Sequence, residues 1–192
     1  MKSVLPVVFA FPQIPHSDCS KLILFGANDA CLPESLTGQH VPIQQYRENL
    51  KTILNHPSIA AHNPTIFLVT PPPVNETHLE EQDLEKGYGA VTRHPEVTQK
   101  YAEVVCEIAA EYEDTKVILV DLWKALMLAR LKLTPNYEGT SEKRDDEGLR
   151  KLLVDGLHLT GAGYKVFSDE VIPLVGREWA DEPLNKPALA FP

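Results

Sequence analysis

The chain has 192 residues, of which 43% are apolar and 23% are charged, and this composition excludes a wholly disordered protein. Its length fits one domain with a substantial core, and its formal net charge of -9 argues against binding to nucleic acid or to anionic membrane surfaces. No apolar run approaches the ~20 residues that a membrane-spanning helix needs.

The amino-terminal stretch and the cysteines indicate the compartment. The apolar run 4–11 faintly resembles a signal peptide, but Pro6 interrupts it and no small-x-small cleavage site follows. Cys19, Cys31 and Cys106 are odd in number and lack C-x-x-C spacing, which argues against a disulfide framework or a zinc knuckle. We therefore expect a reduced, cytoplasmic setting.

The first predicted strand follows an irregular segment, 1–20, which contains three prolines and no glycine. Within that segment, 2–11 fits either the end of a helix or a short strand. The next stretch, KLILFGANDA, starts at Lys21, continues with four apolar residues and is stopped by Gly26. An uninterrupted apolar run ended by glycine is typical of a strand buried on both faces of a parallel sheet.

Helical and extended patterns then alternate along the chain. Apolar residues at helical spacing predict helices at 43–55, 95–112, 122–133, 149–154 and 161–178. Runs of β-branched and aromatic residues predict two more strands, at 65–70 and 116–120. Strands separated by helices imply right-handed crossovers, so we predict a parallel sheet in a three-layer α/β/α sandwich.

The remaining segments are predicted to be loops. Residues 31–41 contain a proline and a glycine and lead from the first strand to a helix. Residues 75–93 are polar and acid-rich, and so long a connection is more often an active-site lid or a mobile loop. Residues 134–147 form a second polar loop, and the tail 180–192 carries three prolines.

A polar motif, Gly26-Ala27-Asn28-Asp29, follows the first strand directly. In open parallel sheets, ligands bind outside the carboxyl ends of the strands, where Asn28 and Asp29 are expected to lie. The side-chain amide of Asn28 can donate to an oxyanion that develops on an ester carbonyl, and Gly26 permits close approach of the backbone. The same residues are common in ordinary turns, so this motif alone leaves both interpretations open.

Asp155 and His158 form a second pattern, within the sequence DGLHLTGAGY. On a tight turn, this spacing lets the carboxylate accept a hydrogen bond from Nδ1–H of the imidazole. The bond fixes the tautomer and leaves Nε2 free as a general base. The alternative is a surface turn in which Asp155 caps the following segment and His158 is solvated.

In this order, the two motifs resemble the G-x-N-D and D-G-x-H blocks of the SGNH (GDSL-type) hydrolase family. LFGANDACLP, TPPPV and DGLHLTGAGYKVF are also similar to the isoamyl acetate-hydrolysing esterases of fungi and yeast. The resemblance implies a flavodoxin-like SGNH hydrolase domain at 21–179, after an amino-terminal remnant at 1–20 and before a tail at 180–192. It further implies hydrolysis of short acyl esters, such as acetates, through an acyl-enzyme and without a cofactor.

The resemblance also implies roles for individual residues. Asn28 would donate to the oxyanion, with Gly26 as part of the same block. Asp155 would orient the imidazole, and His158 would be the general base. Asp29 matches the motif and is expected to give structural support only.

The nucleophile is the point of departure from the family, whose serine lies upstream in a G-D-S block at the end of its first strand. A second upstream block supplies a glycine whose N–H faces the oxyanion. The 25 residues before Gly26 contain no glycine, and Ser3, Ser17 and Ser20 lack the strand-to-turn context of the serine block. We therefore find no nucleophile and expect the family's amino-terminal strands to be missing.

Other chemistries find less support in the sequence. Cys19 or Cys31 would be a conceivable replacement nucleophile, but a small apolar side chain is the simpler interpretation of Cys31. The scattered loop histidines form no H-x-H or H-x-x-x-H pair, so we expect no metal site among His56, His62, His78 and His94.

Three interpretations remain open. The chain is an amino-terminally incomplete esterase with a small ester as its substrate, a noncatalytic relative that serves as a binding or regulatory module, or a truncated gene product. Family members commonly form dimers, and a strand edge left unpaired promotes association. A homodimer or edge-mediated self-association is therefore the expected assembly.

Overall fold

The computed structural model describes residues 20–112, 115–134 and 146–175. The expectations for 1–19, including Ser3, Ser17 and Cys19, therefore lie outside the described residues, as do most of the loop 134–147 and the tail 180–192. No helix within the described ranges is both long enough and apolar enough to cross a membrane.

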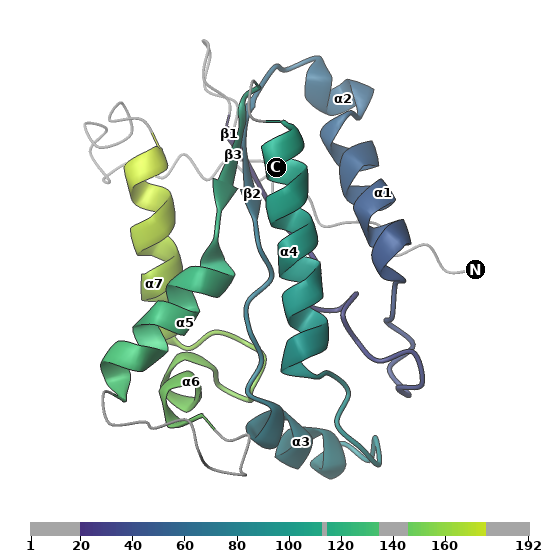
Figure 1. Cartoon of the computed structure of the whole chain (residues 1–192), viewed down its shortest axis with the longest axis vertical. Coiled ribbons are helices and arrows are strands. Elements are labelled where there is room, and N and C mark those ends of the chain that lie inside the picture. Colours follow the sequence, from purple (N-terminus) through teal and green to yellow (C-terminus); the bar gives the residue numbers. More distant parts are fainter. Residues whose placement is uncertain (1–19, 113–114, 135–145, 176–192) are drawn as a thin grey trace, which may run out of the picture.

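A parallel sheet forms the centre of the molecule (Figure 1). In the described part of the chain its strand order is β1-β2-β3, with β1 at Ser20–Leu24, β2 at Thr65–Val69 and β3 at Val117–Val120. Ser20 lies opposite Thr65 and Ile66 opposite Val117, and both pairings are parallel. The three predicted strands are confirmed to within one residue at each end.

Helices cover both faces of this sheet. The helices on one face are α1 (Ile43–Leu54) and α4 (Pro95–Glu111), and those on the other are α5 (Leu122–Leu133) and α7 (Gly161–Val171). Both crossovers, through α1 and through α4, place their helix on the same face, because the strand order advances in one direction. The predicted three-layer α/β/α sandwich is confirmed.

Side chains of β2 alternate between two hydrophobic clusters. Ile66 and Leu68 belong to the cluster shared with α1 and α4, whereas Phe67 and Val69 belong to the one shared with α5. None of these four side chains is more than 6% exposed. Burial on both faces explains why the strand is a continuous apolar run in the sequence.

The prediction of an unstructured connection at 75–93 is wrong. Residues Glu76–Glu85 form helix α3, whose first turn is capped where Asn75 Oδ1 accepts from the His78 N–H at 3.1 Å. The buried residues of α3 are Glu76, Leu79 and Asp83. Because two of these three are acidic, the helix has no apolar stripe, and periodicity in the sequence did not reveal it.

Two short helices also differ from the prediction. A single turn, α2 (Pro57–Ala60), follows α1 directly, and His56 caps it by accepting from the Ser58 N–H. Helix α6 spans Glu147–Leu152, two residues earlier than predicted. It starts earlier because Asp146 caps it, accepting from the Leu149 N–H at 2.9 Å.

The helix predicted at 161–178 is shorter in the structure. Helix α7 ends at Val171 and is followed by a 3₁₀ turn, Ile172–Leu174. Pro173 lies inside that turn and has no N–H to continue the helical hydrogen bonds. Residues 176–178 lie outside the described residues.

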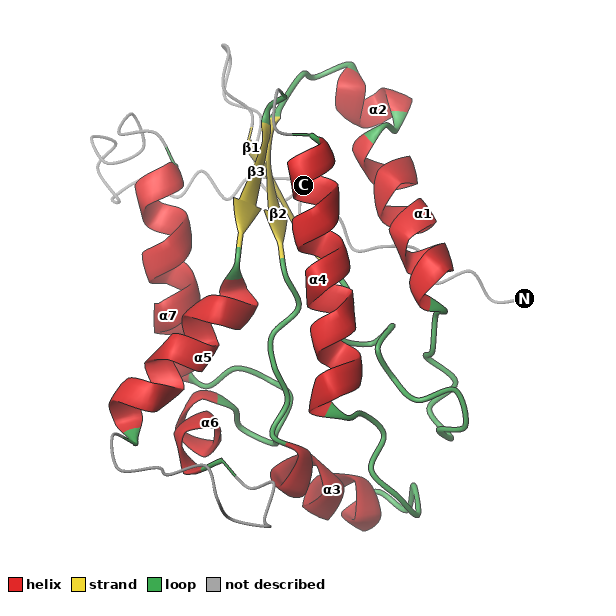
Figure 2. Cartoon of the chain, in the orientation of Figure 1, coloured by secondary structure: helices red, strands yellow, loops and turns green. Residues whose placement is uncertain are grey.

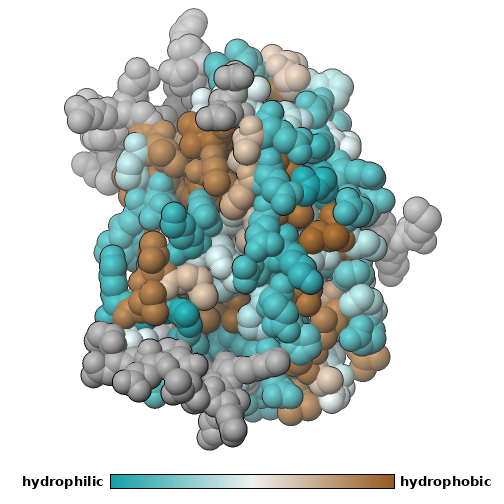
Figure 3. Space-filling model, viewed as in Figure 1, coloured by the Kyte–Doolittle hydropathy of each residue, from teal (hydrophilic) through white to brown (hydrophobic). Residues whose placement is uncertain are grey.

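The described sheet has two edges, at β1 and at β3. Leu22 and Leu24 of β1 are only partly buried, against the cluster shared with α5. Leu119 of β3 is 36% exposed, and apolar side chains are visible over the strands between α7 and α4 (Figure 3). An apolar edge with unpaired N–H and C=O groups promotes association with another strand.

We expect the chain to self-associate through the edge of β1 that no strand among the described residues pairs with. Leu22→Lys adds a charge to that edge, so sedimentation velocity should show fewer dimers and larger species than in the parent at the same concentration. The comparison variant is Leu119→Lys on β3, the other edge of the described sheet: a loss of association there and not with Leu22→Lys would place the interface at β3. Circular dichroism checks that both variants fold. A parent that stays monomeric over a wide concentration range would contradict this prediction.

Candidate functional site

The turn after β1 carries the Gly26-Ala27-Asn28-Asp29 motif, at the end of the sheet to which the strand arrows point (Figure 2). Gly26 has a φ of +112°, and a Cβ there would lie 2.7 Å from Tyr46 Oη, so the position requires glycine. Its N–H donates to Asp29 Oδ2 at 3.1 Å and closes the turn. Since that N–H is engaged, the exposed polar group of the motif is the side chain of Asn28.

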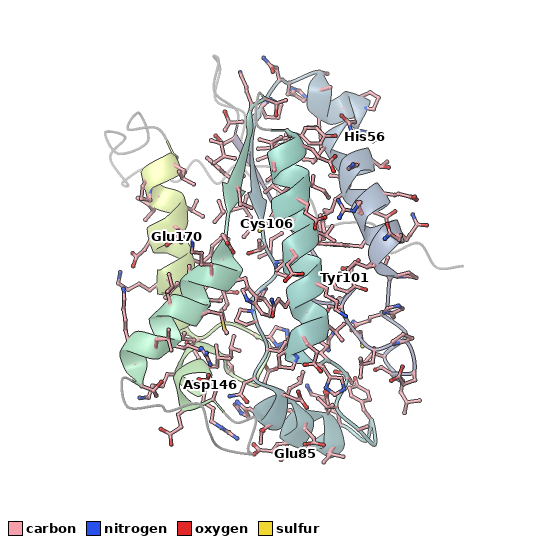
Figure 4. The ribbon with its side chains drawn as sticks, in the orientation of Figure 1. His56, Glu85, Tyr101, Cys106, Asp146 and Glu170 are labelled. Atoms are coloured by element: carbon pink, nitrogen blue, oxygen red, sulfur yellow. The ribbon has the colours of Figure 1, made fainter. Side chains whose placement is uncertain are left out.

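One tyrosine supports this turn, and a second supports the loop that follows it. The hydroxyl of Tyr46 donates to Phe25 O at 3.1 Å, and that of Tyr101 donates to Val41 O at 2.6 Å. Their ring centroids lie 5.0 Å apart, and Tyr101 points from α4 toward α1 (Figure 4). Burial in these surroundings raises the pKa of Asp29 above its ordinary value, although backbone N–H groups partly offset the effect.

Arg93 reaches the same turn from the segment before α4. Its side chain is buried, and Nε donates to Ala27 O at 2.7 Å. Nη2 donates to Asn28 Oδ1 at 3.3 Å and to Gln39 Oε1 at 2.9 Å. No pattern in the sequence predicted this contact, because a lone arginine in a polar segment resembles any solvated loop residue.

Asp155 and His158 are brought together on the loop between α6 and α7. His158 Nδ1 lies 2.8 Å from Asp155 Oδ2, and a carboxylate can only accept, so Nδ1 carries the proton. The imidazole is 73% exposed and the carboxylate 19% exposed. No described residue hydrogen bonds to His158 Nε2, which is therefore left to accept a proton from a substrate or a nucleophile.

Hydrogen bonds set the charge of Asp155. Burial alone would raise its pKa, but bonds from the backbone N–H and the ring of His158, and from the N–H of Leu157, hold the pKa below its ordinary value. The carboxylate is thus ionised at neutral pH and can stabilise a protonated imidazole beside it.

The loop that carries this pair is anchored to the start of α3. The Asn75 N–H donates to Gly156 O at 2.9 Å, and the Val154 N–H donates to His158 O at 2.7 Å. Gly156 has a φ of +81°, and a Cβ there would lie 2.5 Å from the backbone nitrogen of Leu79. The close approach of α3 therefore fixes where Asp155 and His158 lie.

No described hydroxyl or thiol hydrogen bonds to His158. The serines within the described ranges are Ser20, Ser35, Ser58 and Ser168. Cys31 is fully buried, and its Sγ lies 2.8 Å from Thr37 Oγ1 instead. Likewise, no hydrogen bond within the described residues joins Asn28 to the Asp155–His158 pair, although both lie on loops at the same end of the fold.

No metal centre is apparent in these ranges either. Among residues 20–112, 115–134 and 146–175, no three His, Cys, Asp or Glu side chains gather closely enough to hold an ion. His94 Nδ1 lies instead 3.3 Å from a Glu76 carboxylate oxygen, in the segment that precedes α4.

Comparison with known proteins decides the family. Residues 18–171 match the GDSL-like lipase/acylhydrolase family. The chain belongs to this family. A GDSL esterase/lipase of Arabidopsis thaliana is 34% identical over 157 residues, and a human isoamyl acetate-hydrolyzing esterase 1 homolog is 28% identical over 166 residues. These matches cover 81% and 86% of this chain but only 57% and 58% of the two relatives, so the chain spans less than two thirds of their length.

Solved structures of the same architecture include two esterases. An acetyl xylan esterase matches with a TM-score of 0.57 and 20% identity, over 82% of this chain and 67% of that protein. An acetylxylan esterase from Geobacillus stearothermophilus, solved as a catalytic mutant, matches with a TM-score of 0.53 and 22% identity, over 83% and 60%. At such identities the likeness concerns the fold.

Replacing Gly156 by alanine should displace the Asp155–His158 loop. Gly87→Ala is the matched control, because Gly87 has the same φ of +81° but no atom within 4 Å of its added Cβ. The control should lose about 1–2 kcal/mol, the usual penalty of a left-handed conformation. Gly156→Ala should lose roughly 1–3 kcal/mol more from the forced contact with α3. Urea denaturation measures both, and equal losses would contradict the close packing.

The Asp155 carboxylate should stabilise the fold in a pH-dependent way. Its pKa is lower in the folded chain than the ordinary 3.8, so its contribution is present above that pH and is lost as the pH falls through the folded value. Asp155→Asn should therefore lower the free energy of unfolding at pH 7 more than at a pH well below 3.8. The control, Asp169→Asn, removes an exposed ion pair with Lys165 and should change little. An unchanged deficit from neutral to acidic pH would refute the prediction.

Proposed function

We propose that this chain carries the base and oxyanion side of an ester-hydrolase site that acts on short acyl esters, such as acetates, and uses no cofactor. In this proposal His158 is the general base, Asp155 orients it, and Asn28 donates to the oxyanion. Asp29 supports Asn28 indirectly, through its hydrogen bond with the Gly26 N–H. The relatives support the ester chemistry, because the human protein is named as a homolog of isoamyl acetate-hydrolyzing esterase 1 and a structural neighbour as an acetyl xylan esterase.

The observation that carries the proposal is the 2.8 Å contact between His158 Nδ1 and Asp155 Oδ2, with Nε2 unengaged by described residues. This geometry presets the tautomer in which Nε2 can take the proton of a serine hydroxyl as it attacks the ester carbonyl. Asp155 then stabilises the imidazolium, and the amide of Asn28 donates to the oxyanion. The protonated imidazole passes its proton to the departing alcohol, which leaves an acyl-enzyme. His158 then takes a proton from water as the water attacks the acyl-enzyme, and the acid and the free serine are released.

No described serine hydrogen bonds to His158, and we base the expected activity on the absence of a G-D-S block from the sequence. Loss of the nucleophile reduces turnover about a millionfold in a serine hydrolase. We therefore expect the chain to hydrolyse p-nitrophenyl acetate at or near the background rate. A clear turnover that His158→Ala abolishes would contradict this expectation and reveal a nucleophile elsewhere in the chain.

A chimera tests the proposed roles. Residues 1–19 are replaced by the G-D-S-containing amino-terminal segment of a full-length family member, and hydrolysis of p-nitrophenyl acetate is measured. We expect activity to appear, to fall nearly to background with His158→Ala, and to fall roughly a hundred- to a thousandfold with Asn28→Ala. Gln45→Ala, on the exposed side of α1, is the control and should keep full activity.

The outcomes separate the proposal from its rival, a noncatalytic module that has kept the fold of the family. A folded chimera that stays inactive favours the noncatalytic interpretation. If the Asn28→Ala chimera is as active as the chimera that retains Asn28, only the oxyanion role is refuted.

A further inference from the structure

The guanidinium of Arg93 is a buried group that the proposed chemistry does not use. Its residue is 4% exposed, and it donates to acceptors in both the turn after β1 and the following loop. No described carboxylate lies within ion-pair distance of it. A buried cation is costly unless it is well hydrogen bonded, and all three nitrogens of this guanidinium donate hydrogen bonds at the edge of the candidate site.

The contact with Asn28 has a definite chemical direction. A guanidinium has only donors, so the atom of the Asn28 amide that faces Arg93 Nη2, at 3.3 Å, is the acceptor Oδ1. The amide is planar, and its Nδ2 therefore turns away from Arg93. Asn28 is exposed, and no described residue accepts a hydrogen bond from its Nδ2. The same reasoning assigns Gln39 Oε1 as the atom that faces Nη2 at 2.9 Å.

The Arg93 side chain is also held by a hydrogen bond to its neighbour Thr92. Its Nη1 donates to Thr92 Oγ1 at 2.9 Å, and the hydroxyl of Thr92 donates to Asp83 Oδ2 at 2.7 Å. Asp83 is 2% exposed and also accepts from the Thr92 N–H at 2.7 Å. A continuous set of hydrogen bonds therefore runs from α3 through Arg93 to Asn28, and the negative charge of Asp83 offsets the guanidinium across one hydroxyl.

We propose that Arg93 is a positioning residue: it holds the Asn28 amide with Oδ1 inward and Nδ2 outward, and so presets the donor that an oxyanion would meet. This inference rests on the oxyanion role proposed for Asn28. A free asparagine amide can rotate and present either its donor or its acceptor, and an acceptor would repel an oxyanion. Arg93 removes that choice before substrate binds, which is the preorganisation on which oxyanion stabilisation depends.

The test uses the full 192-residue chain and does not depend on turnover. Relaxation of ¹⁵N nuclei gives an order parameter for Nδ2 of Asn28 in the parent and in Arg93→Lys. A lysine keeps the charge but is a single flexible donor group, and it cannot bridge Ala27, Asn28 and Gln39 in a fixed plane. Arg47→Lys is the matched control, because Arg47 forms an ion pair with Glu107 away from the turn. Thermal unfolding of all three proteins reports any general loss of structure.

We expect the parent Nδ2 order parameter to approach the value of about 0.85 of rigid backbone, and that of Arg93→Lys to fall below about 0.6. Arg47→Lys should match the parent. A folded Arg93→Lys in which Nδ2 stays as ordered as in the parent would overturn the proposal. If Arg93→Lys does not fold, the test rests on the parent chain: an Asn28 Nδ2 order parameter below about 0.6 in the parent also overturns the proposal. A folded chimera that stays inactive would contradict the proposed function instead, because the order parameter needs no catalysis.

Discussion

Parallel pairing of β1, β2 and β3 is the constraint on which the candidate site depends. Each strand is only four or five residues long, and all three end at the same side of the sheet. Segments far apart in the sequence are thereby forced to share one end of the fold. The turn after β1, the proline run after β2 and the capped start of α5 after β3 all lie there, because each directly follows the end of a parallel strand.

At that end of the fold, polar contacts join segments that follow different strands. The Thr70 hydroxyl accepts from the Trp123 N–H at 2.8 Å and donates to Asp121 at 3.3 Å, joining the ends of β2 and β3. Asn75 caps α3 and its Nδ2 donates to Asp146 O, which ties α3 to α6. Buried polar groups of this kind are costly to leave unpaired, so each pair specifies one arrangement of its loops.

The two halves of the candidate site are held by different means. The Asp155–His158 loop is positioned by backbone contact with α3, where only a glycine at position 156 permits the approach. The Asn28 turn is positioned by side chains, from Tyr46 on one side and Arg93 on the other. Both depend on α3, because Asp83 of that helix also holds Thr92 beside Arg93. Helix α3 is therefore the common support of a site to which it contributes no reacting group in the proposed chemistry.

The sequence by itself determined the parallel three-layer fold and the local pairs of the motifs. Burial requires an apolar run such as Leu22–Phe25 in a strand and helical spacing of apolar residues around Tyr101. Both patterns are local in the sequence and can therefore be recognised from it. The pairing of Asp155 with His158 is equally local, because the two residues are three positions apart. Only the tertiary structure decided that 75–93 contains a helix and that Arg93 lies against Asn28, 65 positions away. A contact between residues so distant leaves no periodic trace, and its energy exists only after the sheet has brought the two segments to the same edge.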